Sequence, residues 1–111
     1  MHEQAPIPSP SLLVSGEPRD GDFWVVVSGE LDLATSEELR AGLASMDLHP
    51  GGTVRIGVAD VDFVDADSLE QLVTFVRATR LSGRLVGIDG ARGVVRRMAG
   101  LMGFEDELAV A

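Results

Sequence analysis

The alternation of apolar and polar positions predicts two strands at the start of the chain. Ser11 to Gly16 is short and mostly apolar. Phe23 to Val27 is a continuous β-branched and aromatic run, which is typical of a strand covered on both faces. Pro18 to Asp22, between them, is rich in turn-forming residues. The pattern therefore predicts two strands joined by a chain reversal.

Two helices are predicted from capping-box spacing followed by apolar residues at helical intervals. In the first, Thr35 is the expected N-cap, with Glu38 three positions later, and the helix ends before Pro50. In the second, Asp67 is the expected N-cap, with Glu70 three positions later. The residues expected to face the core share a helical spacing of three or four; they are Leu39, Leu43 and Met46 in the first helix, and Leu69, Leu72, Val73 and Val76 in the second.

The remaining pattern completes an α/β chain. Thr53 to Val58 and Arg84 to Ile88 read as strands, Ala59 to Ala66 as a loop, and Arg92 to Met102 as a third helix. The order β-β-α-β-α-β-α predicts an opening β-hairpin followed by right-handed βα crossovers. We expect a single domain with a mixed, mostly parallel sheet of four or five strands.

Length and composition fit one soluble domain. The chain has 111 residues, of which 45% are hydrophobic, and contains no cysteine, which excludes disulfides and thiolate chemistry. Residues 1–10 contain three prolines and are interpreted as a flexible arm, and residues 11–111 as the domain. No apolar run approaches the ~18 residues of a membrane span, so a cytoplasmic location without membrane insertion is the expectation.

Negative charge is concentrated in the middle of the chain. The formal net charge is -9, and the segment from Glu30 to Glu70 holds ten acidic residues against two arginines. This distribution disfavours nucleic acid as a partner, because the phosphate backbone would be repelled. It favours a protein with a basic docking surface. The alternative is that the acidity serves only solubility.

Three stretches, in order and at suitable spacing, resemble the STAS domain family of the anti-sigma-factor-antagonist type. Gly29 to Ala34 is similar to the family's G-E-L-D segment, and Val61 to Leu69 to its F-[IV]-D-S-[ST]-G-L segment. Gly83 to Val86, followed by Val94 to Leu101, resembles the family's G-G-R-L strand and V-R-R-x-L helix.

The resemblance implies a non-enzymatic regulator of transcription in bacteria. Such proteins bind an anti-sigma factor with a kinase-like fold and thereby free the sigma factor. The kinase inactivates them by phosphorylating a serine or threonine at the start of the second helix, because the added charge weakens docking. By position, the resemblance implies a partner-binding surface formed by Glu30, Asp32, Asp65, Ala66, Asp67, Ser68 and Leu69.

The chain departs from the family pattern where the phosphate would be attached. Asp67 occupies the acceptor position, Ala66 replaces the preceding serine, Ser68 replaces the usual glycine, and Gly57 replaces an acid of the preceding strand. Phospho-switching is therefore expected to be lost or altered. Asp67 is interpreted at least as a helix cap and, as a further hypothesis, as a partial imitation of phosphoserine. Ser68, one residue along, is the less favoured acceptor.

Two alternatives remain open. One is a non-switching STAS subunit of a sensory scaffold or transporter complex, which the missing hydroxyl favours. The other is a D-x-D phosphotransfer enzyme with Asp65 as nucleophile. Against this enzyme, all 9 basic residues are arginine, whereas such enzymes usually hold the phosphate with a lysine. No catalytic residue, metal site or cofactor is predicted.

Overall fold

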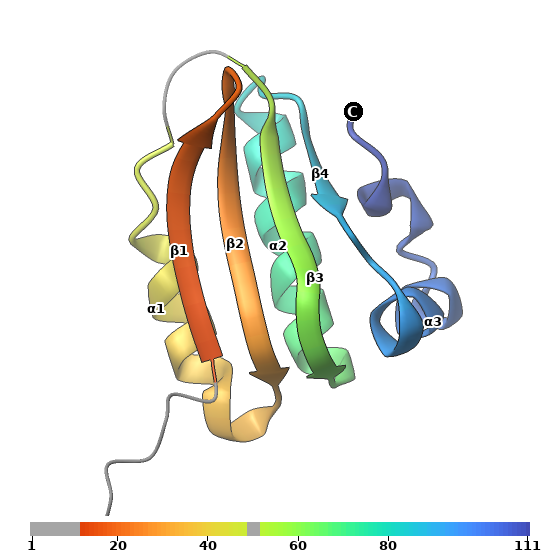
Figure 1. The fold of residues 1–111 in the computed structure, drawn as a ribbon. Helices are drawn as coiled ribbons and strands as arrows, with labels where there is room; N and C mark the ends of the chain where they lie inside the picture. The colour runs from red at the N-terminus through yellow and green to blue at the C-terminus, as the bar shows by residue number, and fades with distance from the viewer. Residues whose placement is uncertain (1–11, 49–51) are drawn as a thin grey trace, which may run out of the picture.

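The computed structural model describes residues 12–48 and 52–111, which form a four-stranded sheet with helices on one face. The strand order is β1-β2-β3-β4; β1 pairs antiparallel with β2, and the other two pairings are parallel (Figure 1). The strands are β1 (Leu12–Arg19), β2 (Asp22–Leu31), β3 (Val54–Val64) and β4 (Val86–Asp89). The opening hairpin and the mixed α/β sheet are confirmed. The predicted arm, residues 1–10, lies outside the described residues.

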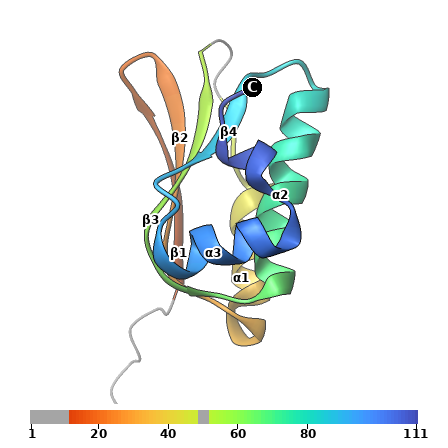
Figure 2. The same cartoon turned by 90° about the vertical axis from the view of Figure 1, so that its right-hand side faces the viewer.

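Three helices and two short 3₁₀ segments complete the fold. They are α1 (Ser36–Ala44), α2 (Ala66–Leu81), α3 (Gly93–Met102), η1 (Leu33–Thr35) and η2 (Glu105–Leu108). Figure 2 shows α1 and α2 against one face of the sheet, with α3 alongside them. The side chains predicted to face the core are buried, except that Met46 is half-buried. No helix in the described ranges has both the length and the apolar character needed to cross a bilayer.

β2 is covered on one face only, which corrects the prediction that both faces are covered. Its core side chains Phe23, Val25 and Val27 are buried, whereas Trp24 and Val26 on the other face are only partly buried. An added Cβ at Gly57 would lie 3.2 Å from two atoms of the Trp24 ring. Glycine therefore stands at position 57 where Trp24 lies flat across β3.

Two strands are longer than the sequence predicts. The expected loop from Ala59 to Ala66 is wrong, because β3 continues to Val64, with pairs such as Leu31↔Val64 extending the parallel ladder past two register shifts. β1 likewise runs to Arg19, so the reversal is confined to the tight Asp20-Gly21 turn, where both residues have positive φ. Cross-strand pairing extends both strands into segments whose composition indicates turns and loops.

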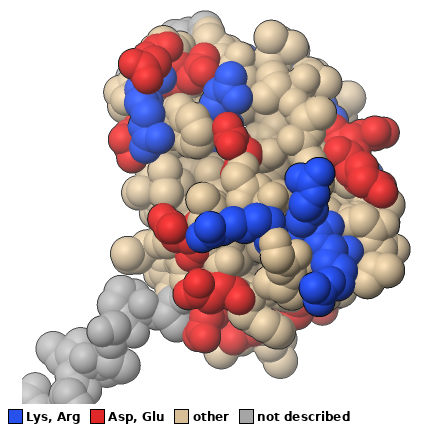
Figure 3. Space-filling model, turned by 45° about the vertical axis from the view of Figure 1, so that its right-hand side comes forward, with Lys and Arg blue, Asp and Glu red and all other residues tan. Residues whose placement is uncertain are grey.

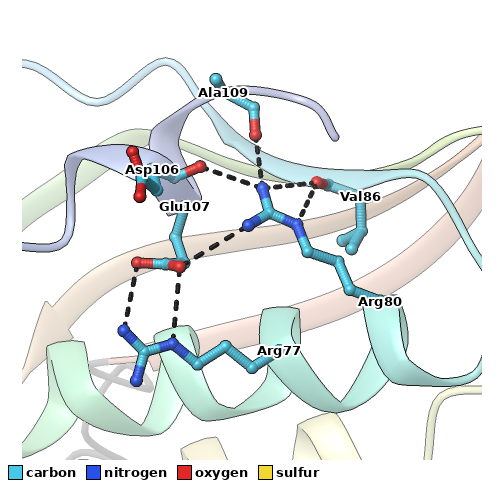
Figure 4. A network of polar contacts seen from close by, with 6 residues as sticks. All are labelled: Arg77, Arg80, Val86, Asp106, Glu107 and Ala109. Atoms are coloured by element: carbon cyan, nitrogen blue, oxygen red, sulfur yellow. Dashed lines mark hydrogen bonds and ion pairs between the residues drawn. The ribbon is translucent and has the colours of Figure 1, made fainter.

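The segment after α3 folds back on the edge of the sheet. Ala111 and Val86 exchange two backbone hydrogen bonds, of 3.1 and 3.2 Å, so the end of the chain lies beside β4. Arg80 of α2 donates to the carbonyls of Val86, Asp106 and Ala109, the last at 2.7 Å (Figure 4). The Arg80 side chain thus joins three backbone segments by hydrogen bonds.

Candidate functional site

The predicted site residues come from two segments that the sheet brings side by side. Glu30 and Asp32 lie at the end of β2 and just beyond it, and Asp65 to Leu69 follow β3. The backbone N–H of Asp65 donates to the carbonyl of Leu31 at 2.9 Å. The carboxyl ends of parallel strands meet at one edge of a sheet, and this hydrogen bond joins the two segments there.

Asp65, not Asp67, is the N-cap of α2. Its backbone is extended and its Oδ1 accepts from the N–H of Ser68 at 2.8 Å. Its carbonyl also accepts from Leu69 at 3.1 Å, which begins the helical ladder. The cap prediction for Asp67 is wrong by two residues, because Ala66 is already helical. Asp67 lies in the first turn, where its charge still faces the positive end of the helix dipole.

Hydrogen bonds between Asp32 and Thr35 stabilise the segment between β2 and α1. The two residues form a reciprocal capping box: Thr35 N–H donates to Asp32 Oδ1 at 3.1 Å, and Asp32 N–H donates to Thr35 Oγ1 at 3.0 Å. The Thr35 hydroxyl donates to the Glu30 carbonyl at 2.8 Å. Thr35 does precede α1, but its side chain does not cap that helix, so the predicted box with Glu38 is wrong. The Asp-x-x-Thr spacing from Asp32 to Thr35 was the sequence signal from which this capping box could have been predicted.

Exposure divides the predicted residues into a surface set and a supporting set. Glu30, Ala66 and Asp67 are exposed, and Asp32 and Asp65 are partly buried. We name these five residues the acidic entrance. Ser68 and Leu69 have exposed fractions of only 1% and 0%, so their side chains support the entrance from the core.

The sequence analysis did not predict that two apolar residues beside the acidic entrance are exposed. Leu33 in η1 is 84% exposed, and Phe63 near the end of β3 is 46% exposed. Phe63 is the register partner of Glu30, so the aromatic ring and the acid come from neighbouring strands. An isolated exposed leucine is ordinary, but an aromatic residue beside charges is typical of an interface. The sequence analysis placed Phe63 in a loop and Leu33 in the family-like segment from Gly29 to Ala34, and it gave no exposure signal for either.

The site is an exposed acidic surface where β2 and β3 end. Within residues 12–48 and 52–111, no three acidic or histidine side chains lie close enough together to hold a metal ion. The Asp65 carboxylate, which the D-x-D alternative requires as a nucleophile, is engaged in capping α2. What remains is a rigid, negatively charged corner with adjacent apolar side chains.

This architecture agrees with the comparison to known families. A family model described as "Mlab, STAS domain" matches residues 18–110. The chain belongs to the STAS domain family. The resemblance seen in the sequence is thereby confirmed, and the two structural neighbours at 25% identity support the anti-sigma-factor-antagonist type. No curated protein matches the chain.

Solved STAS structures share the fold over most of their length. An anti-sigma factor antagonist from Mycobacterium paratuberculosis has a TM-score of 0.74 and 25% identity, covering 90% of this chain and 86% of that one. The STAS domain of an antisigma-factor antagonist from Rhodobacter sphaeroides has a TM-score of 0.60 and 25% identity, covering 73% and 88%. SpoIIAA in its unphosphorylated form shares the fold alone, at 15% identity, a TM-score of 0.64, and coverage of 86% and 84%.

Proposed function

We propose that this STAS domain is an anti-sigma-factor antagonist-like binding module that docks a kinase-fold anti-sigma factor through the acidic entrance. We propose further that phosphorylation at the start of α2 no longer switches it, because Asp67 stands where relatives carry the acceptor hydroxyl. The observation that carries the proposal is the exposed Asp67 carboxylate in the first turn of α2, next to a Ser68 hydroxyl that is buried.

Docking is supported by the chemistry of the surface. The acidic entrance supplies long-range attraction for a basic partner, which raises the rate of encounter. Leu33 and Phe63 supply apolar area next to the charges, and aromatic anchors of this kind carry most of the affinity at protein interfaces. Two structural neighbours with 25% identity are anti-sigma factor antagonists.

Loss of switching is supported by the positions of residues 65–69. Ala66 and Asp67 are exposed but have no hydroxyl, and the Ser68 hydroxyl oxygen is buried without a hydrogen-bond partner. A kinase could reach Ser68 only after the first turn of α2 opened. The Asp67 carboxylate carries one charge, against roughly −1.5 to −2 for a phosphoserine, so any mimicry is partial.

The same absence of an exposed hydroxyl favours one second candidate, a STAS subunit that stays permanently bound in a larger complex. The two candidates differ in the partner. An antagonist binds a soluble kinase-fold anti-sigma factor reversibly, whereas a constitutive subunit copurifies with a scaffold or transporter.

Identifying the binding partner distinguishes the antagonist from the constitutive subunit. The chain is used as tagged bait in its own host, and captured proteins are identified by mass spectrometry; recovery of a kinase-fold anti-sigma factor is the expected result. Purified partner is then titrated calorimetrically. Asp67→Lys and Phe63→Ala should each weaken binding at least 10-fold, about 1.4 kcal/mol. Glu17→Lys, the same charge change on β1, should not. Recovery of a stoichiometric transporter or scaffold assembly instead would support the second candidate.

Phosphorylation tests the switching proposal directly. Incubated with the captured kinase and ATP, the native chain should stay unmodified, while Asp67→Ser should gain one phosphate and then lose affinity for the kinase. Intact-mass spectrometry measures both. Stoichiometric phosphate on Ser68 of the native chain would contradict the proposal that switching is lost, but not the proposal of docking.

A further inference from the structure

Opposite charges lie side by side where α3 packs against the second half of β3. β4 pairs with β3 only from Val54 to Gly57, and α3 lies against β3 as well. The guanidinium of Arg92 donates to the carbonyl of Ala59 at 3.1 Å, which places the start of α3 next to Asp60. Figure 3 shows basic side chains in a band over α3, with acidic side chains beside it.

The basic side of this face is formed by Arg92, Arg96 and Arg97, which we name the arginine ridge; all three are exposed. Arg92 is the N-cap residue that precedes α3, whereas Arg97 and Leu101, four apart within the helix, share a face. Leu101 is 79% exposed, which adds an apolar contact to the ridge. The ridge therefore combines cations with exposed apolar area.

The arginine ridge differs from the arginines that form ion pairs within residues 12–48 and 52–111. In the part of the chain that the structure describes, five arginines form ion pairs with acidic side chains: Arg19, Arg40, Arg55, Arg77 and Arg80. No ion pair within that part joins a ridge arginine to a carboxylate, although the exposed Asp60 and Asp62 lie on the adjoining strand. The two sets of charge are thus both available to a partner.

We propose that this face is self-complementary and binds a second copy of the chain about a twofold axis. An axis running along the boundary between the two patches places each arginine ridge over the Asp60–Asp62 patch of the other copy, so the contact forms twice. The proposal goes beyond partner docking, because neither patch belongs to the acidic entrance.

The charges on this face favour a second copy of the chain over nucleic acid or an anionic lipid surface. Nucleic acid or an anionic lipid surface would meet the arginine ridge, but also the neighbouring acids and a net charge of -9. A partner that suits this face needs both signs in adjacent patches, in reversed order. A second copy, turned over, presents that arrangement.

Salt dependence gives the proposal a characteristic signature. At about 10 mM salt the Debye length is ~30 Å, so two molecules of charge -9 repel as wholes. At about 0.1 M it is ~10 Å, so only the facing patches interact, and at about 1 M it is ~3 Å, so the patches are screened as well. Dimerisation should therefore be strongest near 0.1 M salt. Exposed ion pairs are individually weak, so we expect a dissociation constant on the order of 0.1 mM.

Sedimentation equilibrium of the full chain, with two charge-swapped variants, tests the dimer. One variant carries Arg96→Glu with Arg97→Glu, the other Asp60→Arg with Asp62→Arg. Each alone should be monomeric at concentrations where the native chain dimerises. Their equimolar mixture should dimerise again, because every reversed charge then meets an opposite one. Arg19→Glu with Arg40→Glu, which changes the net charge as the arginine-ridge variant does but on β1 and α1, should still dimerise.

Two results would overturn the proposal. One is a native chain that stays monomeric up to about 1 mM at 0.1 M salt, ten times the expected dissociation constant. The other is dimerisation that only strengthens up to 1 M salt, which would indicate apolar association. The native salt profile needs no variant, so the test stands even if a swapped chain folds poorly. Neither result bears on anti-sigma-factor docking, which is measured with a different protein.

Discussion

At the scale of single residues, two acids separated by one position have different physical roles. Asp65 is partly buried and its carboxylate accepts the backbone N–H of Ser68, so it stabilises the start of α2. Asp67 is exposed in the first turn and interacts with the helix mainly through the dipole. Asp67 thus contributes less than Asp65 to the structure of the helix, and its exposed charge is available to a partner.

This difference predicts unequal stability effects. Asp65→Ala should lower the free energy of unfolding by about 1 kcal/mol, since an N-cap hydrogen bond is lost. Asp67→Ala, the matched control, should lower it by roughly 0.3–1 kcal/mol, and that smaller loss should fade in high salt. Urea unfolding at low and high ionic strength measures both. Equal losses that salt does not change would mean that Asp67 also caps the helix.

At the scale of elements, Arg80 attaches the C-terminal segment to the edge of the sheet. Its guanidinium bonds three carbonyls and lies 3.5 Å from Glu107, whose exposed fraction is only 5% (Figure 4). Arg77 approaches the same carboxylate from a more exposed position, with 56% of its side chain accessible. Removing Arg80 therefore takes a hydrogen bond from each of three carbonyls and one of the two cations beside the buried Glu107 carboxylate, whereas removing Arg77 takes only the other cation.

We expect Arg80→Ala to lower the free energy of unfolding by about 2–3 kcal/mol, because three hydrogen bonds to backbone carbonyls are lost and the buried Glu107 carboxylate keeps only the more exposed Arg77 as a counter-ion. Hydrogen exchange should quicken at the amides of Val86 and Ala111. Arg77→Ala should cost less than about 1 kcal/mol and leave those amides protected. Unchanged protection in the Arg80 variant would show that apolar packing alone holds the segment.

At the end of the sheet away from the acidic entrance, Asp22 joins β2 to the start of β3. Its carboxylate accepts from Arg55 Nε at 2.9 Å and from the N–H of Thr53 at 3.1 Å. The hydrogen bond from Arg55 and that from Thr53 lower the pKa of Asp22 below its usual value, although partial burial acts in the opposite sense. The ionised carboxylate is therefore the form that the fold favours.

A lowered pKa contributes stability above the pKa of the unfolded chain and loses it as the pH falls through the folded value. For Asp22 the loss should fall below about pH 4. Asp22→Asn should therefore be less stable than the native chain at neutral pH, with the difference shrinking toward pH 3. Thermal unfolding across this range measures it, with the exposed Asp47→Asn as control. A constant difference at every pH would rule out the ionic contribution.

At the scale of the whole molecule, acids gather at one corner of the sheet, and no three described acidic or histidine side chains form a metal cluster. The helices cover one face, and β2 and β3 end side by side at this corner (Figures 1 and 2). A shallow charged corner suits protein recognition better than catalysis, which requires a site that excludes water.

We accordingly expect no phosphatase turnover from the purified chain with magnesium, measured with a chromogenic phosphate ester and with phosphopeptides. Robust turnover that Asp65→Asn abolishes while the protein remains folded would restore the phosphotransfer alternative. Asp67→Asn serves as the matched control, because it removes a carboxylate without removing the cap.

Local pattern by itself determined the order of strands and helices, the opening hairpin, the core faces of α1 and α2, and the family, because these depend on side-chain periodicity and short motifs. Tertiary structure decided the rest. Pairing with β2 extends β3 to Val64. The hydrogen bond from Asp65 to the Leu31 carbonyl then fixes where α2 starts, and Asp65 is therefore its N-cap. The exposure of Phe63 and the burial of Ser68 likewise depend on which segments meet in space, and sequence spacing does not encode that.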